Sequence, residues 1–194
     1  MNLAWPSALL LLTAWAAQAD DADKLRALGG GVFTKGGAVA EISLNRSRIT
    51  DDQLKLVANF ANLTDLSLEQ TKIGDAGLAH LRGLAKLEWL NLYRTQVGDV
   101  GLAHLANLPR LQHLPIGETR VTDAGMAHIA KLKRLVYLGL RGNKIGDGAM
   151  AHLAKLPKLT GLHLGETRLT DKGTRQFVAL GQLQKLWLHD TRIT

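Results

Sequence analysis

The sequence of 194 residues lacks cysteine altogether, contains four prolines, and has few aromatic residues, which make up 5% of the chain. Without cysteine the protein has no disulfide, no thiolate nucleophile and no cysteine-based zinc site. The catalytic signatures G-x-S-x-G, H-E-x-x-H and the P-loop are also missing, and the glycines at 29–31 are not followed by the Lys-Ser/Thr pair that holds phosphates. We therefore expect no enzyme, no metal site and no cofactor.

The remaining composition is that of a folded domain with a positive charge. Hydrophobic residues make up 46% of the chain and charged residues 21%, which excludes wholesale disorder. The formal net charge is +7. Such a surplus favours acidic partners, although it does not define a site.

The first 19 residues have the pattern of a signal peptide. An apolar run is followed by Ala17-Gln18-Ala19, which is the small-residue pattern before a cleavage site. We expect export to the periplasm, the envelope or the medium, and no stable membrane span after cleavage, because the run is short. An uncleaved anchor is the alternative. Residues 1–19 carry no charged side chain, so the mature chain keeps the net charge of +7.

A repeat of 24 residues organises the rest of the sequence. The sequence GLAHL occurs at 77–81 and 101–105, and similar segments follow at 125–129 and 149–153. The pattern is L-x-x-L-x-L-x-x-T-x-I-[TG]-D-x-G-L-x-x-L-x-x-L-x-x. Its first half alternates with period two, which predicts a short strand, and its second half has apolar residues three apart, which predicts a short helix. The units begin at Val39, Leu63, Leu87, Leu111, Leu135, Leu159 and Leu183.

This pattern resembles the leucine-rich repeat, and in particular the bacterial exported type of 24 residues, which is similar to GALA-class and cysteine-containing repeats. The resemblance covers residues 39–194, as six full units and a partial seventh. It implies an α/β solenoid with a curved parallel sheet inside and short helices outside. It says little about function, because the fold is a scaffold.

Residues 20–38 do not fit the repeat and are expected to form an N-terminal cap. Residues 21–28 predict a short helix, and the segment around Gly36-Gly37 predicts a β-hairpin that leads into the first unit. Such a cap would cover the open edge of the core. At the other end we expect a truncated chain, an exposed edge, or a docked partner or second copy.

Three polar columns follow the repeat and have structural interpretations. Threonine, serine or Asn143 occupies the place after each strand, where it is expected to satisfy backbone groups. A column of aspartates stands where each helix begins and suits capping and the helix dipole. His80, His104, His128 and His152 are expected to point to solvent on the convex side, too far apart to share a zinc ion.

The outward-facing strand positions are the best candidates for a binding site. They form the concave side of the predicted sheet, here called the sheet face, and after residue 19 they include every Trp and Tyr. Aromatic residues with Arg and His are typical of interaction hot spots, although strand preference also explains aromatics there. We expect glycines between the rings to leave a shallow depression. The predicted protein-binding residues are Trp89, Tyr93, His113, Tyr137, Arg141, His163 and Trp187.

A second candidate surface consists of positive charges at the turns that lead into the strands, here called the basic rim. Solvation is the simplest interpretation, and binding of an acidic polymer or glycan is the alternative. No specific nucleic-acid motif accompanies the charges. The rim residues are Arg82, Lys86, Arg110, Lys131, Lys133, Arg134, Lys155 and Lys158.

Overall fold

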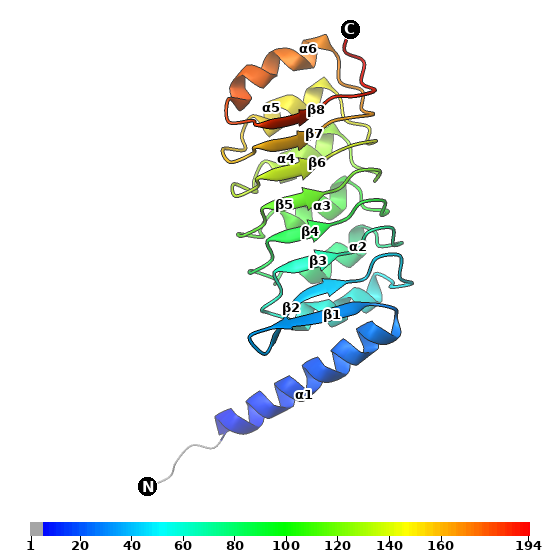
Figure 1. Cartoon of the computed structure of the whole chain (residues 1–194), viewed down its shortest axis with the longest axis vertical. Coiled ribbons are helices and arrows are strands. Elements are labelled where there is room, and N and C mark those ends of the chain that lie inside the picture. Colours follow the sequence, from blue (N-terminus) through cyan, green and yellow to red (C-terminus); the bar gives the residue numbers. More distant parts are fainter. Residues whose placement is uncertain (1–5) are drawn as a thin grey trace.

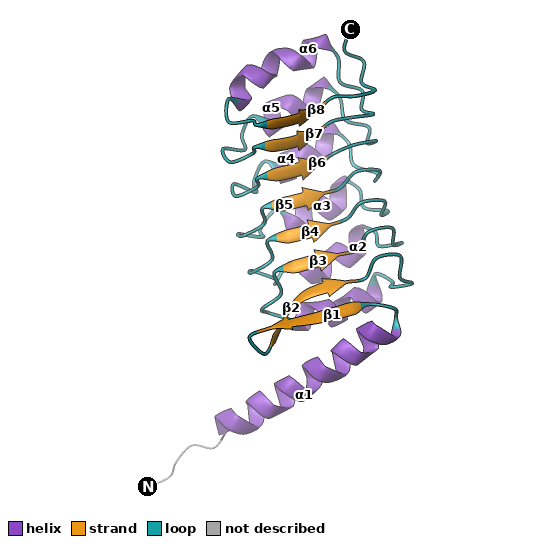
Figure 2. Ribbon diagram, viewed as in Figure 1, coloured by secondary structure: helices purple, strands orange, loops and turns teal. Residues whose placement is uncertain are grey.

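The computed structural model describes the backbone of residues 6–194 and the side chains from residue 16 onward, so part of the expected export signal lies outside the described residues. One sheet of eight strands runs the length of the molecule in the order β1 to β8, with the helices stacked behind it (Figures 1 and 2). The strands are β1 Gly31–Lys35, β2 Ala38–Ser43, β3 Asp65–Ser67, β4 Trp89–Asn91, β5 His113–Pro115, β6 Tyr137–Gly139, β7 Gly161–His163 and β8 Lys185–Trp187. The α/β solenoid predicted from the repeat is confirmed.

The repeated leucines cause this stacking. Inward strand residues such as Leu66 and Leu68 are fully buried, and a single unit has too few neighbours to bury them. From β2 onward the strands pair in parallel and in register, one unit to the next. The ladder between β4 and β5 is reduced to the pair Trp89 and His113, and Pro115 in β5 has no N–H to donate there.

The helical half of each unit is short and varies between α-helix and 3-10 helix. These helices form the opposite layer, with residues such as Leu78 and Leu81 fully buried against the sheet. Their bounds are η1 Asp52–Asn59, α2 Asp75–Leu78, η2 Ala79–Leu81, α3 Asp99–Leu105, η3 Asp123–Gly125, α4 Met126–Ile129, η4 Asp147–Ala149, α5 Met150–Leu153, α6 Asp171–Thr174 and η5 Arg175–Leu180.

The expected cap of helix and hairpin is present at the N-terminal end. Helix α1 spans Pro6–Ala27, and its last turns bury Ala22 and Leu25 against the first unit. β1 and β2 form an antiparallel hairpin whose turn places Gly36 and Gly37 at positive φ, a conformation that glycine adopts without strain. Among the described residues, no helix is both long enough and apolar enough to cross a membrane.

The edge of the sheet at which the strands end, here called the strand-end edge, is held by threonine side chains. The hydroxyl of Thr71 donates to the carbonyl of Leu68 at 2.7 Å, and Thr95, Thr119, Thr167 and Thr191 repeat this bond in their own units. Asn143 instead reaches the neighbouring unit and donates to the carbonyl of Ile116 at 2.7 Å. The predicted role of this column in satisfying backbone groups is therefore confirmed.

The aspartate column acts differently from the prediction. Each aspartate begins a helix or, in the case of Asp51, directly precedes one, but its carboxylate accepts hydrogen bonds from the next unit rather than from its own helix. Asp75 accepts the backbone N–H of Gly98 at 2.6 Å, and Asp147 accepts both the N–H and the hydroxyl of Thr170 at 2.9 and 2.7 Å. The bonds join neighbouring units, which sequence periodicity could not reveal.

These carboxylates also explain the glycine two places after the aspartate in four of the six units. A Cβ atom at Gly101 would lie 2.5 Å from Oδ1 of Asp75 and 3.2 Å from its Cα. The same oxygen accepts the Gly98 N–H, so it has no room to move without losing that bond. The glycine of the motif D-x-G is therefore required by its contact with the aspartate of the preceding unit. The fifth unit has the order Asp147, Gly148, Ala149. The glycine that contacts Asp123 of the preceding unit is therefore Gly148, one place earlier than in the other units.

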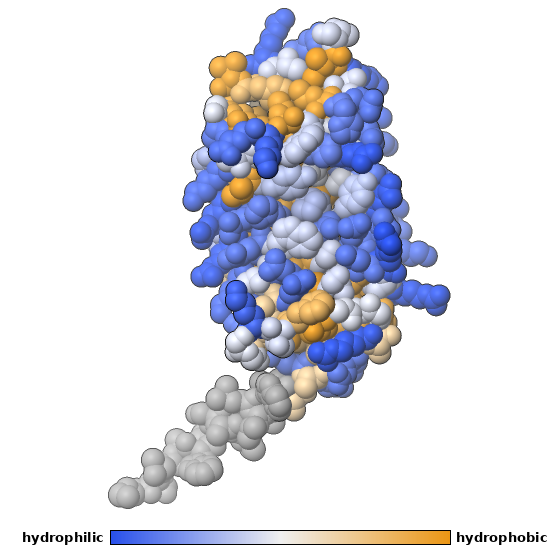
Figure 3. Space-filling model, viewed as in Figure 1, coloured by the Kyte–Doolittle hydropathy of each residue, from blue (hydrophilic) through white to orange (hydrophobic). Residues whose placement is uncertain are grey.

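The C-terminal end of the stack is more exposed than its middle. Leu186 in β8 is 39% exposed, whereas the equivalent Leu162 and Leu138 are fully buried, because no further strand packs against β8 in this structure. Val178 is also exposed. Figure 3 shows hydrophobic side chains gathered at this end.

Candidate functional site

The sheet face carries the predicted binding residues on one continuous surface. The strands are in register, so Trp89, His113 and Tyr137 occupy the same place in adjacent strands. Tyr93 and Arg141 stand just beyond the ends of β4 and β6. All of the seven predicted residues are half-buried, except Trp187, which is 39% exposed. The structure thus brings the predicted residues to one side of the sheet.

The C-terminal half of this face contains a cluster of rings. The centroids of His113 and Tyr137 lie 6.5 Å apart in a stacked arrangement, and Tyr137 meets Trp187 edge-on at 6.3 Å. His163 lies 5.5 Å from Trp187 and 5.2 Å from His189. We call these five residues the ring cluster. His189 was not among the predicted binding residues. It belongs to the cluster because its ring contacts that of His163 in the preceding unit.

Glycines determine where the rings lie. A Cβ atom at Gly161 would approach the Tyr137 ring to 3.0 Å, and one at Gly117 would approach the Tyr93 ring to 3.1 Å. His189 covers Gly165 in the same way. The depression expected above these glycines is therefore filled by the rings, because an aromatic side chain packs closely on a residue without a Cβ. The result is a fixed aromatic surface rather than a hollow.

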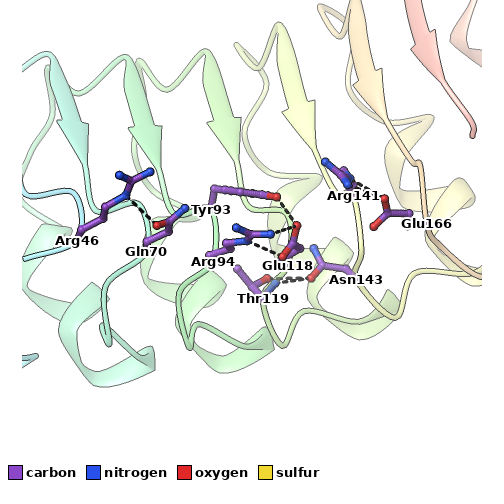
Figure 4. A network of polar contacts seen from close by, with 9 residues as sticks. All are labelled: Arg46, Gln70, Tyr93, Arg94, Glu118, Thr119, Arg141, Asn143 and Glu166. Atoms are coloured by element: carbon purple, nitrogen blue, oxygen red, sulfur yellow. Dashed lines mark hydrogen bonds and ion pairs between the residues drawn. The ribbon is translucent and has the colours of Figure 1, made fainter.

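A row of charged contacts borders the rings along the strand-end edge (Figure 4). Arg94 donates to the carboxylate of Glu118 at 2.6 and 3.2 Å, and the hydroxyl of Tyr93 donates to the same carboxylate. Arg141 forms the equivalent pair with Glu166 at 2.6 Å. The hydrogen bonds from Arg94 and Tyr93 hold the pKa of Glu118 below its usual value. Tyr93 and Arg141 are thus anchored before any partner arrives.

This row stands on an unusual backbone position. The eighth residue of every 24-residue unit, which lies just after the strand, has a positive φ, and most of these residues are not glycine. The left-handed conformation costs a residue with a side chain about 1 kcal/mol. In exchange, it directs Arg94, Glu118 and Glu166 towards neighbouring units, where they form these pairs. The full row is Arg46, Gln70, Arg94, Glu118, Gly142, Glu166 and Asp190.

The imidazole of His163 is poised to stay neutral. Burial lowers its pKa, and the nearby His189 and Arg141 lower it further, while Glu166 opposes them. Its Nε2 atom is buried and has no hydrogen-bond partner within the described structure. Tyr137 is likewise shifted, since burial raises the pKa of its phenol. Both shifts favour the uncharged forms of His163 and Tyr137.

The N-terminal half of the sheet face is polar and acidic. Glu41 and Asp65 are paired in register across β2 and β3, and the hydroxyl of Ser67 is buried without a partner. Phe33, 53% exposed, pairs with Glu41 across the hairpin and so lies on the same face. The sequence prediction missed Phe33 because it counted only Trp and Tyr. The alternating pattern of the hairpin would have placed it.

Within the described residues, one group of side chains has a spacing suited to a metal ion. Glu166, His189 and Asp190 offer ligand atoms within 4.8 Å of one another, and all three are exposed. Glu166 is already paired with Arg141 at 2.6 Å. A cation there would compete with the guanidinium group, so this arrangement does not by itself make a metal centre.

The histidines of the helix layer are less exposed than predicted. His80, His104, His128 and His152 are all half-buried, because neighbouring helices pack close enough to cover part of each ring. Nε of Arg82 donates to Nδ1 of His104 at 3.0 Å, which links two units. Burial and the charge of Arg82 lower the pKa of His104. These contacts are those of packed side chains.

The basic rim lies on the opposite edge of the sheet from the charged row, where the strands begin. All eight of its side chains are exposed, and no described acidic group forms an ion pair with any of them. A few have polar contacts, such as Lys86 with the amide oxygen of Asn62 at 2.6 Å. The rim and the ring cluster are separate surfaces with different chemistry.

Comparisons with known proteins agree with this geometry. A family profile described as "Leucine Rich repeat" matches residues 61–81, which contain β3, α2 and η2. That segment carries the same leucines and aspartate as the other units. The chain has the leucine-rich repeat fold. A search of curated proteins finds no match.

Solved structures with this fold resemble the chain over most of its length. An internalin C2 from Listeria monocytogenes has 29% sequence identity and a TM-score of 0.61, covering 79% of this chain and 60% of the internalin. An internalin InlF from the same species has 26% identity and a TM-score of 0.63, covering 78% and 48%. The chain therefore spans between about half and two thirds of those proteins. The PEPR1–AtPEP1 structure, at 17% identity and a TM-score of 0.54, covers 84% of this chain and 26% of its own and shares the fold.

Proposed function

We propose that this leucine-rich repeat protein binds another protein through its sheet face, with the ring cluster as the centre of the contact. The observation that carries the proposal is the fixed arrangement of rings over glycines, with Trp187 at 39% exposure beside Tyr137 and His163. Rings that are already ordered lose little entropy on binding, and Trp, Tyr and Arg contribute most to binding hot spots.

Two further features support a protein partner. Arg141 and Tyr93 flank the rings and are held by Glu166 and Glu118. Arg141 keeps further N–H groups to donate, and the hydroxyl oxygen of Tyr93 can accept a hydrogen bond, so both present oriented polar groups at the border of the surface. The acidic N-terminal half of the face, with Glu41 and Asp65, would complement a basic region of the same partner. A surface with an apolar centre and a polar border matches the general anatomy of protein interfaces.

We further propose that residues 1–19 are an export signal and that residues 20–38 remain as the cap of an exported protein. In support, Asp21, Ala22 and Leu25 are buried immediately after this segment, while Ala17 and Ala19 are exposed. Cleavage after Ala19 would leave the packed part of α1 in place. N-terminal sequencing of the exported protein is expected to begin at Asp20, and an intact Met1 would contradict cleavage.

The binding proposal is tested by capture from an envelope extract with the full chain and a Trp89→Ala, Tyr137→Ala, Trp187→Ala variant. A matched control replaces His80, His128 and His152 by alanine on the helix layer. We expect a protein that is retained by the wild type and the control at high salt and is lost with the aromatic variant. Equal capture by all three forms, with circular dichroism showing them folded, would refute the ring cluster as the binding centre.

A further inference from the structure

The most regular feature of the basic rim is a set of four rigid turns. In each, two buried leucines are joined by a backbone hydrogen bond, from Leu87 N to Leu84 O at 3.0 Å in the second unit and likewise in the next three. Such a turn leaves its two central residues outside the core. Pro109 and Pro157 occupy the first central place in two of the turns, where the fixed φ of proline favours the turn. The second central residue is basic in all four: Lys86, Arg110, Arg134 and Lys158.

These four residues form a regular row along the stack. Each precedes the first residue of its strand by three places, and those first residues pair in register from Trp89 to Gly161. The spacing along the row is therefore close to the distance between strands, about 4.8 Å. Asn62 and Gln182 occupy the equivalent places before and after the row. The row of basic residues is thus bounded at each end by a neutral amide side chain.

Nothing nearby neutralises the row. In the turns of these four units, Glu88 is the one acidic residue, and it forms no ion pair within the described structure. Two unit charges about 4.8 Å apart in water repel by about 0.9 kcal/mol. On the strand-end edge, by contrast, Arg94 and Arg141 each have a glutamate partner. A row of like charges fixed at one spacing suits a ligand with negative charges repeated along its length.

We propose that Lys86, Arg110, Arg134 and Lys158 bind an extended linear polyanion carrying sulfate or phosphate groups, which lies along the stack across the turns. The row is one-dimensional, which fits a chain rather than a globular acidic surface. The turns contain no aromatic residue on which a base could stack, so a sulfated or phosphorylated polymer fits better than single-stranded nucleic acid. This surface is independent of the ring cluster and does not depend on the function proposed for it.

The test uses the full chain with two fluorescent probes, a heparin-derived dodecasaccharide and an inorganic polyphosphate of similar charge. The row variant is Lys86→Gln, Arg110→Gln, Arg134→Gln, Lys158→Gln. The control variant is Lys72→Gln, Arg120→Gln, Lys144→Gln, Arg168→Gln, which removes the same charge from four exposed residues on the strand-end edge. Thermal melts check that both variants are folded.

We expect the wild type to bind at least one probe, with an affinity that falls on the order of 50-fold between 50 and 200 mM salt, as about four ionic contacts predict. The row variant should lose at least tenfold in affinity at 50 mM salt, and the control less than threefold. The two probes show whether sulfate or phosphate is preferred. Equal losses of affinity in the two variants would mean that net charge alone governs binding, and would overturn the proposal that the row is the binding site.

Tighter binding to anionic lipid vesicles than to either polymer would also overturn the proposal, because it would assign the row to a membrane surface. Vesicles containing phosphatidylglycerol are the probe for that outcome. Failure of both polymers to bind the wild type at 50 mM salt refutes it directly. None of these results bears on protein capture by the ring cluster, so the two proposals fail separately.

Discussion

The two edges of the sheet are built from the same 24-residue repeat but have opposite character. Along the strand-end edge, polar side chains are bonded to the neighbouring unit: Asp75 to Gly98, Arg94 to Glu118 and Asn143 to Ile116. Along the basic rim, exposed cations such as Arg110 and Arg134 have no acidic partner in the described structure. One edge joins the units, and the other leaves its charges available to a ligand.

This contrast teaches that periodicity alone does not distinguish a structural column from a binding one. Both the aspartates and the rim cations recur every 24 residues. They differ in what faces them: the carboxylates meet backbone N–H groups that need an acceptor, whereas the cations meet solvent. Substitutions of the bonded residues on the strand-end edge should therefore destabilise the protein, and equivalent substitutions on the rim should not.

The largest difference is expected between two glycines. Gly101→Ala on the strand-end side should destabilise the protein by about 3 kcal/mol, because the new Cβ overlaps Asp75 and displaces the acceptor of the Gly98 N–H. Gly83→Ala, beside the rim, meets nothing within 4 Å and should leave the stability unchanged or slightly raised. Urea denaturation measures both. Equal losses would show that the contact between units is not what restricts Gly101.

A smaller effect is expected from a carboxylate of the aspartate column. Asp147→Ala should cost about 2 kcal/mol at pH 7, because the N–H and hydroxyl of Thr170 lose their acceptor. Glu88→Ala on the rim edge should stay within about 0.5 kcal/mol of the wild type.

The Asp147 effect should also depend on pH in a defined direction. Hydrogen bonds from Thr170 hold the pKa of Asp147 in the folded state below its ordinary value of 3.8. Its stabilisation is therefore fully present well above pH 3.8 and is lost as the pH falls through the folded-state pKa. The difference between wild type and variant should be constant from pH 7 to about pH 5 and shrink below about pH 4. A difference that grows on acidification would contradict this.

The smallest expected effect concerns the rim charges themselves. Arg134→Gln should stabilise the protein by a few tenths of a kcal/mol at low salt, because it relieves repulsion from Arg110 and Lys158, and the gain should vanish near 1 M salt. Arg94→Gln, which loses its pairing with Glu118, should instead destabilise the protein slightly. Melting temperatures across a salt series measure both. A loss of stability in Arg134→Gln would indicate an intramolecular role for that residue.

Several elements of the fold could be predicted because they depend on local pattern. The spacing of Leu66 and Leu68 places a strand in each unit, Gly36-Gly37 places the hairpin turn, and the threonine column places the bonds at the strand ends. These features repeat or lie close together in sequence. Alternation within the strands also identified the residues of the sheet face.

Other features depended on distances between units and were not predictable in this way. The partner of each aspartate lies in the next unit, the depression between the rings is filled because Tyr137 packs over Gly161, and the histidines of the helix layer are partly covered by neighbours. The contact of His189 with His163 likewise joins two neighbouring units. Such contacts follow from pairing across units that no single unit encodes.

The sequence by itself determined the repeat, the parallel stacking and the side of the sheet on which the aromatic residues lie, because leucines spaced for burial permit one arrangement. The tertiary structure decided which polar columns are satisfied and which remain available. A carboxylate or a cation acquires its role only from the group that the next unit places within hydrogen-bond distance. At the strand-end edge that group is an N–H or a counter-charge, and along the basic rim no described acidic group lies within that distance.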